Sequence, residues 1–474
     1  MVMGELTQET QLLVIGGGPG GYAAAFRAAD LGLEVTMIDE GSGPGGACLF
    51  RGCIPSKTLL FVTELMYDAA RSEAMGIAFE PPRLDLERLR SWKDRVVDRL
   101  ASGLVTLADR RGVQLVQARA EFESSERVRL HGSEIAHFKF RHAIVATGSR
   151  PAALPGVSTG GIGRIMDSTG ALLLTEVPKT LLVVGGGYVG LELASVYAAL
   201  GTRVTLVDVG TRLLPGLDED LVRPLRRRVE SEFEAILTNT RVKAMRELPD
   251  HVEVALDGEA EQPEREFDRV LVAIGRTPNT EGLNLEKTGV KLNERGFIAV
   301  DEQQRTGDQR IFAVGDVVGG ATLAHKAMRE GRIAAEVIAG QRSAFDVRAI
   351  PAVVYTDPQV AWCGLSEEQA GREGRQVKVS RFPWTASGRA ATMGATEGLT
   401  KVVFDPESGR VLGVGIVGRG AGELIGEGVL AIEMGAVAED MALTMHPHPT
   451  LSETEGEVAE AFLGSATHLL PTKR

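Results

Sequence analysis

Strand-like and helix-like patterns of apolar residues alternate along this chain. Apolar and polar positions alternate in 377–382 and 401–405, which predicts two strands, and 421–435 has the pattern of a helix. Amphipathic spacing across 86–108 predicts a long helix whose role is packing rather than chemistry. Near the N-terminus, the first apolar stretch, 11–15, predicts entry into a buried strand.

One unit of strand, turn, helix and strand occurs twice. Segments 12–39 and 181–208 align without a gap, and half of their positions are identical. Each begins with an apolar run, passes through Gly-x-Gly-x-x-Gly into a stretch rich in Ala and Leu, and closes with a β-branched strand that ends on an acid. This order is the fingerprint of a dinucleotide-binding βαβ unit. Two copies predict two dinucleotides, or one dinucleotide and one flavin dinucleotide.

Each glycine of this pattern, and the acid that closes it, has a physical role. The first glycine permits the tight turn, the second lets the backbone approach a pyrophosphate, and the third lets helix and strand pack closely. The helix N-terminus faces the anion, and the closing carboxylate can accept hydrogen bonds from ribose hydroxyls. These positions are Gly16, Gly18, Gly21 and Asp39 in the first copy, and Gly185, Gly187, Gly190 and Asp208 in the second.

The residues after the second copy favour NAD over NADP. Asp208 would repel a 2′-phosphate, and 209–211 bring no cation to meet one, so that Arg212 is the nearest base.

Length and charge limit the remaining possibilities. The chain has 474 residues, which is enough for about three domains. Its net charge of −12, without a long basic run, argues against a nucleic-acid-binding face. No apolar run approaches a membrane-spanning length, and the polar start, 1–10, lacks the features of a signal peptide. We therefore expect a cytoplasmic protein, although a matrix protein without its transit peptide would look the same.

Two of the three cysteines form a candidate redox centre. Cys48 and Cys53 are close enough in sequence for a small disulfide loop, and Pro55 predicts that Cys53 lies near a helix N-terminus, where a thiolate is stabilised. Lys57 follows one helical turn later. Inert burial, a metal site and a structural bond are the alternatives, and no second Cys or His pair supports a metal. Cys363 is expected to be a core residue.

A histidine pair near the C-terminus supplies a candidate base. Prolines flank His448 and hold it in a stiff loop, and Glu453 can return to one nitrogen of its imidazole. A histidine oriented by a carboxylate is the arrangement that removes a proton from a thiol. His446 is expected to be structural.

These motifs together resemble the pyridine nucleotide–disulfide oxidoreductases, nearly throughout the chain. That family includes glutathione reductases, mercuric reductases and dihydrolipoamide dehydrogenases. The motif CxxxxCIPSK after the first glycine-rich turn and HxHPTxxE near the end carry the resemblance. Further matching segments are 146–151, 273–279, 311–317 and 323–326.

The resemblance implies FAD and NAD as cofactors and assigns residues to each. Glu192 would pair with Lys57 near the nicotinamide, although an ordinary acid on a helix surface is the alternative. His448, with Glu453, would act as the base across a homodimer interface on the partner's cysteines. The implied contacts are Lys57, Ala120, Gly148, Asp316 and Ala324 for FAD, and Val242 and Gly275 for NAD.

Within the family, the lipoamide branch fits best. Asp208 replaces the arginines that glutathione reductases use for NADPH. The resemblance implies oxidation of dihydrolipoamide by a Cys48–Cys53 disulfide and FAD, with lipoyl domains of a 2-oxo acid dehydrogenase complex as partners. Ala47 and Phe50 depart from the family's usual Thr and Asn, which puts flavin affinity or potential in question. Another NAD(P)H-dependent disulfide or metal reductase and a docking subunit are the other hypotheses.

The expected fold class is α/β, with two Rossmann-like units and a C-terminal α+β dimerisation domain. The expected regions are an FAD domain (1–150), an NAD domain (151–276), a central segment completing the FAD site (277–348) and an interface domain (349–474).

Overall fold

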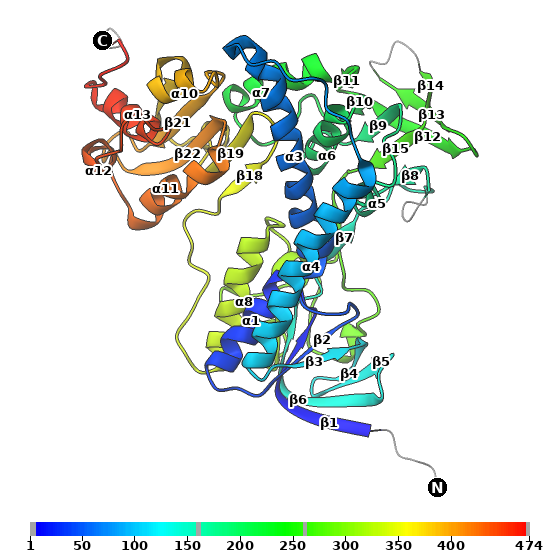
Figure 1. Ribbon diagram of the computed structural model, residues 1–474. Coiled ribbons are helices and arrows are strands. Elements are labelled where there is room, and N and C mark those ends of the chain that lie inside the picture. The colour runs from blue at the N-terminus through cyan, green and yellow to red at the C-terminus, as the bar shows by residue number, and fades with distance from the viewer. Residues whose placement is uncertain (1–5, 158–162, 259–262, 471–474) are drawn as a thin grey trace.

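A computed structural model describes residues 6–157, 163–258 and 263–470. The first five residues, on which part of the expectation about the polar start rests, lie outside this set. The chain forms three lobes around one long central helix (Figure 1). The first nucleotide unit lies at the bottom of the view, and the second unit and the C-terminal lobe lie on opposite sides of the helix at the top.

The first repeat copy is built as predicted. Strand β1 pairs in parallel with β2 and β6, and the strand order of its sheet is β3-β2-β1-β6-β5-β4, with β17 added beside β6. Helices α1 and α8 pack so closely that a Cβ on Gly331 would meet the Gly20 carbonyl oxygen at 2.2 Å. The elements are β1 (Leu6–Ile15), α1 (Pro19–Asp30), β2 (Val35–Asp39), β3 (Gln114–Gln117), β4 (Arg119–Ser124), β5 (Arg127–His131), β6 (Ile135–Val145), β17 (Ile311–Ala313) and α8 (Ala324–Ile338).

The second copy repeats this geometry in a parallel sheet of order β11-β10-β9-β15-β8. A Cβ on Gly190 would meet the carbonyl oxygen of Gly185 at 2.0 Å, and one on Gly21 would meet that of Gly16 at 1.8 Å. The close helix–strand packing predicted for the third glycine is therefore confirmed in both copies. The elements are β8 (Ile165–Met166), α5 (Ser168–Leu173), β9 (Thr180–Val184), α6 (Tyr188–Ala199), β10 (Arg203–Val207), α7 (Glu219–Glu232), β11 (Ala235–Leu237) and β15 (Arg269–Val272).

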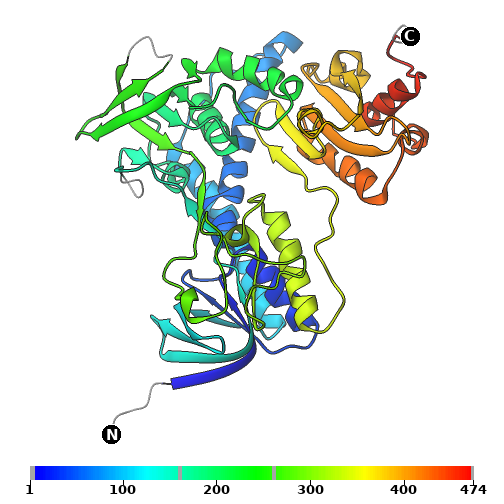
Figure 2. The same ribbon diagram turned by 180° about the vertical axis from the view of Figure 1, so that it is seen from behind.

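Helix α3 (Cys53–Arg71) connects the lobes. It starts at the first nucleotide unit and runs between the second unit and the C-terminal lobe (Figures 1 and 2). Its Leu59 and Leu60 belong to the same buried cluster as Leu191 of α6 and Val354 of the C-terminal lobe. The amphipathic helix predicted for 86–108 is α4 (Leu86–Arg110), which packs against α3 and is capped by Asp85.

The C-terminal lobe is an antiparallel sheet of order β18-β19-β22-β21-β20 with helices packed on it, as the α+β prediction requires. The predicted strands and helix correspond to β20, β21 and α11. Cys363 of β19 is 2% exposed, so its assignment to the core is confirmed. The elements are β18 (Ala352–Val354), β19 (Gln359–Gly364), α9 (Glu367–Glu373), β20 (Lys378–Pro383), α10 (Gly388–Thr392), β21 (Leu399–Phe404), β22 (Val411–Gly418), α11 (Ala421–Met434), α12 (Ala438–Leu443) and α13 (Glu453–Leu463).

Two small sheets complete the fold. Strand β7 pairs antiparallel with β16, so the chain leaves the first nucleotide unit and returns to it side by side. The boundaries proposed at 150 and 276 fall on these two strands. No helix among the described residues is long and apolar enough to cross a membrane. The elements are α2 (Gly46–Arg51), β7 (Ser149–Pro151), β12 (Arg241–Glu247), β13 (Val252–Asp257), β14 (Glu264–Phe267), β16 (Arg276–Pro278) and the short 3-10 turns Ser72–Met75, Leu285–Lys287, Gly315–Val318 and Trp384–Ala386.

Glu455 of α13 is an unfavourably buried carboxyl group in the C-terminal lobe. Its side chain is fully buried, and neither carboxylate oxygen has a hydrogen-bond partner among the described residues. Burial, followed by the negative charge of Glu427, raises the pKa of Glu455 to about 9. The folded chain therefore holds a proton at neutral pH that the unfolded chain releases. This proton's contribution to stability is complete below about pH 4 and is lost as the pH rises through about 9.

We predict that Glu455→Gln increases the free energy of unfolding at pH 8 by roughly 1–3 kcal/mol, because the ionised carboxyl no longer favours the unfolded chain. The difference should vanish near pH 4, where both side chains are neutral. Melting temperatures of both proteins between pH 4 and pH 8 would measure it. Glu407→Gln, at an exposed turn, serves as the control and should show no such trend. A pH-independent difference would contradict the assignment.

Candidate active site

The first glycine-rich turn is shaped to receive a phosphate. Gly16 has φ +106°, and a Cβ there would meet the Ala146 carbonyl oxygen at 2.3 Å. Asp39 holds the turn, because its carboxylate accepts hydrogen bonds from the backbone N–H groups of Gly17 at 2.5 Å and Gly41 at 2.7 Å. Helix α1 starts directly after this turn with Gly18 at its N-cap. The backbone therefore leaves room for an anion at a helix N-terminus.

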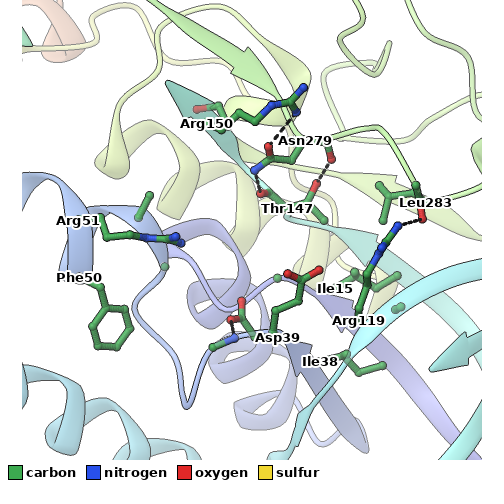
Figure 3. Close-up of a pocket in the computed structure, with 18 of the residues that line it drawn as sticks. Ile15, Ile38, Asp39, Phe50, Arg51, Arg119, Thr147, Arg150, Asn279 and Leu283 are labelled. Carbon is green, nitrogen blue, oxygen red and sulfur yellow. Dashed lines mark hydrogen bonds between the residues drawn. The ribbon is translucent and has the colours of Figure 1, made fainter. Parts of the chain in front are cut away.

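A long cleft passes over this turn. A cavity of about 870 Å³ lies on the side of Ile38 and Leu283 (Figure 3), and one of about 250 Å³ lies on the side of the cysteines. Gly16, Gly46 and Thr147 line both cavities. An elongated dinucleotide with a central pyrophosphate fits this shape. The expected FAD contacts Gly148, Asp316 and Ala324 line the smaller cavity, and Ala120 lines the larger one.

Three distant segments are hydrogen-bonded together on one wall of the cleft. Thr147 and Asn279 exchange two hydrogen bonds, of 2.7 and 2.9 Å, which Figure 3 shows. Ser149 donates to the Asp316 carboxylate at 2.5 Å and accepts from Arg276 at 2.6 Å. These bonds fix the orientation of the Asp316 carboxylate at the cavity wall.

The two cysteines lie at the junction of α2 and α3. No disulfide joins them in this structure, and the Cys48 thiol donates a hydrogen bond to Cys53. This hydrogen bond, and then the positive charge of Lys57, lower the pKa of Cys53 to about 7, while the same contact and burial raise the pKa of Cys48. Because Cys53 is the first residue of α3, the helix dipole acts in the same direction. The prediction that Cys53 lies near a helix N-terminus is confirmed.

Lys57 and Glu192 form a largely buried ion pair beside the cysteines. Lys57 Nζ lies 2.7 Å from Glu192 Oε2, and Glu192 is only 3% exposed. The predicted pairing is confirmed, and the surface-acid alternative for Glu192 is wrong. The C-terminal lobe completes this group, because Tyr355 donates its backbone N–H to Glu192 at 2.9 Å and places its ring 4.7 Å from Lys57 Nζ.

His448 and Glu453 form the predicted pair, but away from the cysteines of their own chain. His448 Nδ1 lies 2.8 Å from Glu453 Oε1, and the His448 side chain is 74% exposed. No histidine in the described part of the chain lines the cavity that holds Cys48 and Cys53. His446 is largely buried and is bonded to Glu427 at 2.8 Å, which supports a structural role.

The second glycine-rich turn repeats the features of the first. The Asp208 carboxylate accepts hydrogen bonds of 2.6 Å from the N–H groups of both Gly186 and Gly210. Gly185 has φ +114° and approaches the Ala273 carbonyl oxygen closely. Tyr188 and Glu192, on the helix that follows this turn, line the cavity of the cysteines, so this helix reaches the same site. Val242, a half-buried residue of β12, and Gly275, after β15, lie in the same unit, and their contacts to NAD stay predictions.

The sequence interpretation missed several residues that form the site. No local motif indicated the aromatic ring of Tyr355, and Arg51 lines both cavities without having been considered. Ser149, Arg276 and Asn279 lie inside matched segments, yet only the structure shows that they bond to one another across the cleft.

Comparisons with known proteins agree with this geometry. The family model described as pyridine nucleotide-disulphide oxidoreductase matches residues 10–331, and that of its dimerisation domain matches 350–459. The dihydrolipoyl dehydrogenase of Haemophilus influenzae is 47% identical over 97% of this chain and 96% of that protein. The dihydrolipoyl dehydrogenase of Geobacillus stearothermophilus is 44% identical over 99% and 100%, respectively.

Solved structures match over a similar extent. LpdA of Mycobacterium tuberculosis has a TM-score of 0.88 and 28% identity, and covers 95% of this chain and 99% of its own. The HOCl-induced flavoprotein disulfide reductase RclA of Escherichia coli has a TM-score of 0.84 and 28% identity, with the same coverage.

We predict that the thiol of Cys48 lowers the pKa of Cys53 through its hydrogen bond. In the reduced protein, Cys48→Ser keeps a donor and Cys48→Ala removes it. The Ala variant should therefore show a pKa for Cys53 about one unit higher than the Ser variant. The pH dependence of iodoacetamide alkylation, located by mass spectrometry, measures this pKa. Cys363, whose pKa burial raises to about 12, is the internal control. If the alkylation rates of Cys53 in the two variants had the same pH dependence, the hydrogen bond from residue 48 would not lower the pKa of Cys53.

Proposed function

The chain belongs to the pyridine nucleotide-disulphide oxidoreductase family, and from this premise we propose that it oxidises dihydrolipoamide to lipoamide with reduction of NAD⁺. The observation that carries the proposal is the hydrogen-bonded pair Cys48 and Cys53, which lines the same cavity as the phosphate-binding turn and Glu192. A disulfide formed here would face both the flavin cleft and the second nucleotide unit. The 47% identity to a dihydrolipoyl dehydrogenase over nearly the whole chain supports this substrate.

FAD and NAD are the cofactors of this enzyme. FAD supplies two-electron chemistry between a dithiol and a nicotinamide. We assign the first glycine-rich turn and Asp39 to its pyrophosphate and ribose, and Asp316 and Ala324 to its flavin end. The residues assigned to NAD are Gly185, Gly187, Gly190, Asp208, Val242 and Gly275.

The proposed reaction is a thiol–disulfide exchange followed by electron transfer. His448, held by Glu453, accepts a proton from one substrate thiol at Nε2, and the resulting thiolate attacks Cys48 Sγ. The Cys48–Cys53 bond breaks, and Cys53 leaves as the thiolate that α3 and Lys57 stabilise. The second substrate thiol then attacks its own mixed disulfide and releases lipoamide and the Cys48 thiol. The substrate dithiol loses two electrons, and the cysteine pair gains them.

Lys57 and Glu192 position groups rather than exchange protons in this scheme. The ammonium of Lys57 stabilises negative charge on Cys53, and Glu192 keeps that ammonium in place. Because Glu192 also accepts the Tyr355 N–H, the pair is fixed from both sides.

The enzyme forms a homodimer through its C-terminal domain, and we propose that His448 of one subunit completes the site of the other. The exposed position of His448, outside the cavity of its own chain's cysteines, supports this arrangement. The partner in catalysis would be the lipoyl domain of a 2-oxo acid dehydrogenase complex, and the proposed location is the cytoplasm.

Two alternative functions would give different experimental results. A related NAD(P)H-dependent disulfide or metal reductase would consume NADPH and ignore dihydrolipoamide. A docking subunit would keep its cellular function after Cys48→Ser.

We predict that anaerobic addition of dihydrolipoamide to the purified protein produces a long-wavelength thiolate-to-flavin absorption band, followed by reduction of added NAD⁺. NADP⁺ should be reduced far more slowly, because Asp208 opposes a 2′-phosphate. Stopped-flow visible spectroscopy would record both steps, with Cys53→Ser, which lacks the thiolate beside the flavin, as the control that binds flavin but shows no band. A flavoprotein that bleaches with NADPH and does not respond to dihydrolipoamide would refute the proposed substrate.

Mixed dimers test whether the base comes from the partner subunit. Cys48→Ser and His448→Gln should each abolish turnover alone. If sites combine cysteines and histidine from different chains, each heterodimer has one intact site, and a randomly exchanged equal mixture should regain about a quarter of wild-type activity. Subunits with different affinity tags allow the heterodimer to be purified and assayed directly. An inactive heterodimer would place both groups on one chain.

A further inference from the structure

Four arginines line the nucleotide cleft, and three of them are bound to the protein. Arg119 donates to the Gly282 carbonyl oxygen, Arg150 pairs with Glu281, and Arg276 bonds to Ser149. The side chain of Arg51 has no hydrogen bond or ion pair with any residue in 6–157, 163–258 or 263–470. Among the described residues, Arg51 is therefore the arginine of this cleft whose side chain is not paired with the protein.

Arg51 lies where the two cavities of the cleft meet. It is one of the residues that line both the larger and the smaller cavity. Figure 3 shows its guanidinium directed into the cleft, toward the region between Asp39 and Thr147. A guanidinium presents a planar set of donors that matches phosphate oxygens.

Helix α2, which ends at Arg51, is pressed against the phosphate-binding turn. Gly46, its first residue, has φ +57°, and a Cβ there would meet Gly18 Cα at 2.5 Å. Ala47 and Arg51 are one helical turn apart and line the same cavities, and Ala47 offers only a methyl group. Any charged contact from α2 to an anion at the turn must therefore come from Arg51.

We propose that Arg51 is a phosphate-binding residue that pairs with the pyrophosphate of bound FAD. The position of the pyrophosphate follows from the glycine-rich turn and the N-terminus of α1, where nucleotide phosphates bind. The inference rests on FAD as the occupant of this cleft, which is part of the proposed function. Arg51 would add affinity for the cofactor and take no part in the redox steps.

The test is the rate at which the holoenzyme loses flavin, followed by flavin fluorescence at a fixed temperature below unfolding. Arg51→Val should release FAD about tenfold faster, which corresponds to about 1.4 kcal/mol. Arg51→Lys, which keeps the charge but not the planar fork, should be intermediate. Added salt should accelerate release from the wild type and have less effect on Arg51→Val, because the lost contact is electrostatic. Circular dichroism would verify that each variant is folded.

Arg223→Val provides the matched control, since it removes an equal charge from an exposed position on α7 in the second nucleotide unit. Its flavin release should match the wild type. The inference is overturned if Arg51→Val releases flavin no faster than this control. It is also overturned if Arg51→Val raises only the KM for a lipoyl domain, because Arg51 would then bind the substrate protein. A wild-type protein that contains no flavin would instead contradict the proposed function.

Discussion

The ion pair between Lys57 and Glu192 is the contact that holds the three lobes in register. Lys57 comes from the first nucleotide unit, Glu192 from the second, and the C-terminal lobe adds the backbone N–H of Tyr355. A carboxylate this buried requires a cation and donors; loss of one partner from a fully buried pair costs about 3–5 kcal/mol, and the cost here is smaller because the Lys57 side chain is 32% exposed. A movement of one lobe relative to the others around α3 would therefore separate the Glu192 carboxylate from one of its partners.

The segment that carries the two cysteines is held at the start of α2 and in the first turn of α3. Close approach of Gly46 to Gly18 fixes the start of α2 at the phosphate-binding turn, and Lys57 fixes the first turn of α3. Cys48 and Cys53 lie between these anchors. Because the chain is fixed on both sides of the cysteines, the pair is held facing the cleft.

The sequence was informative where the signal is local. The repeat, the helix at 86–108 and the cysteine segment follow from glycine spacing, periodicity and helix start signals, which neighbouring residues determine. The bonds of Arg276 with Ser149, and the ring of Tyr355 over Lys57, join residues more than a hundred positions apart. No residue pattern encodes such contacts, because they depend on how β7 and β16 pair and how the C-terminal lobe docks.

The exposure of His448 indicates that, in the proposed reaction, proton transfer and electron transfer take place with residues from different subunits. A general base must come within hydrogen-bond reach of the proton it accepts. In one protomer, the cysteines, the flavin cleft and the second nucleotide unit share one cavity, while the His448–Glu453 pair faces outward from another lobe. In the proposed reaction, the residues around the path from Cys53 toward the nicotinamide therefore all come from one chain. In the same proposal, the base that removes the substrate proton comes from the partner subunit, so association through the C-terminal domain would be required for the first step and not for the later ones.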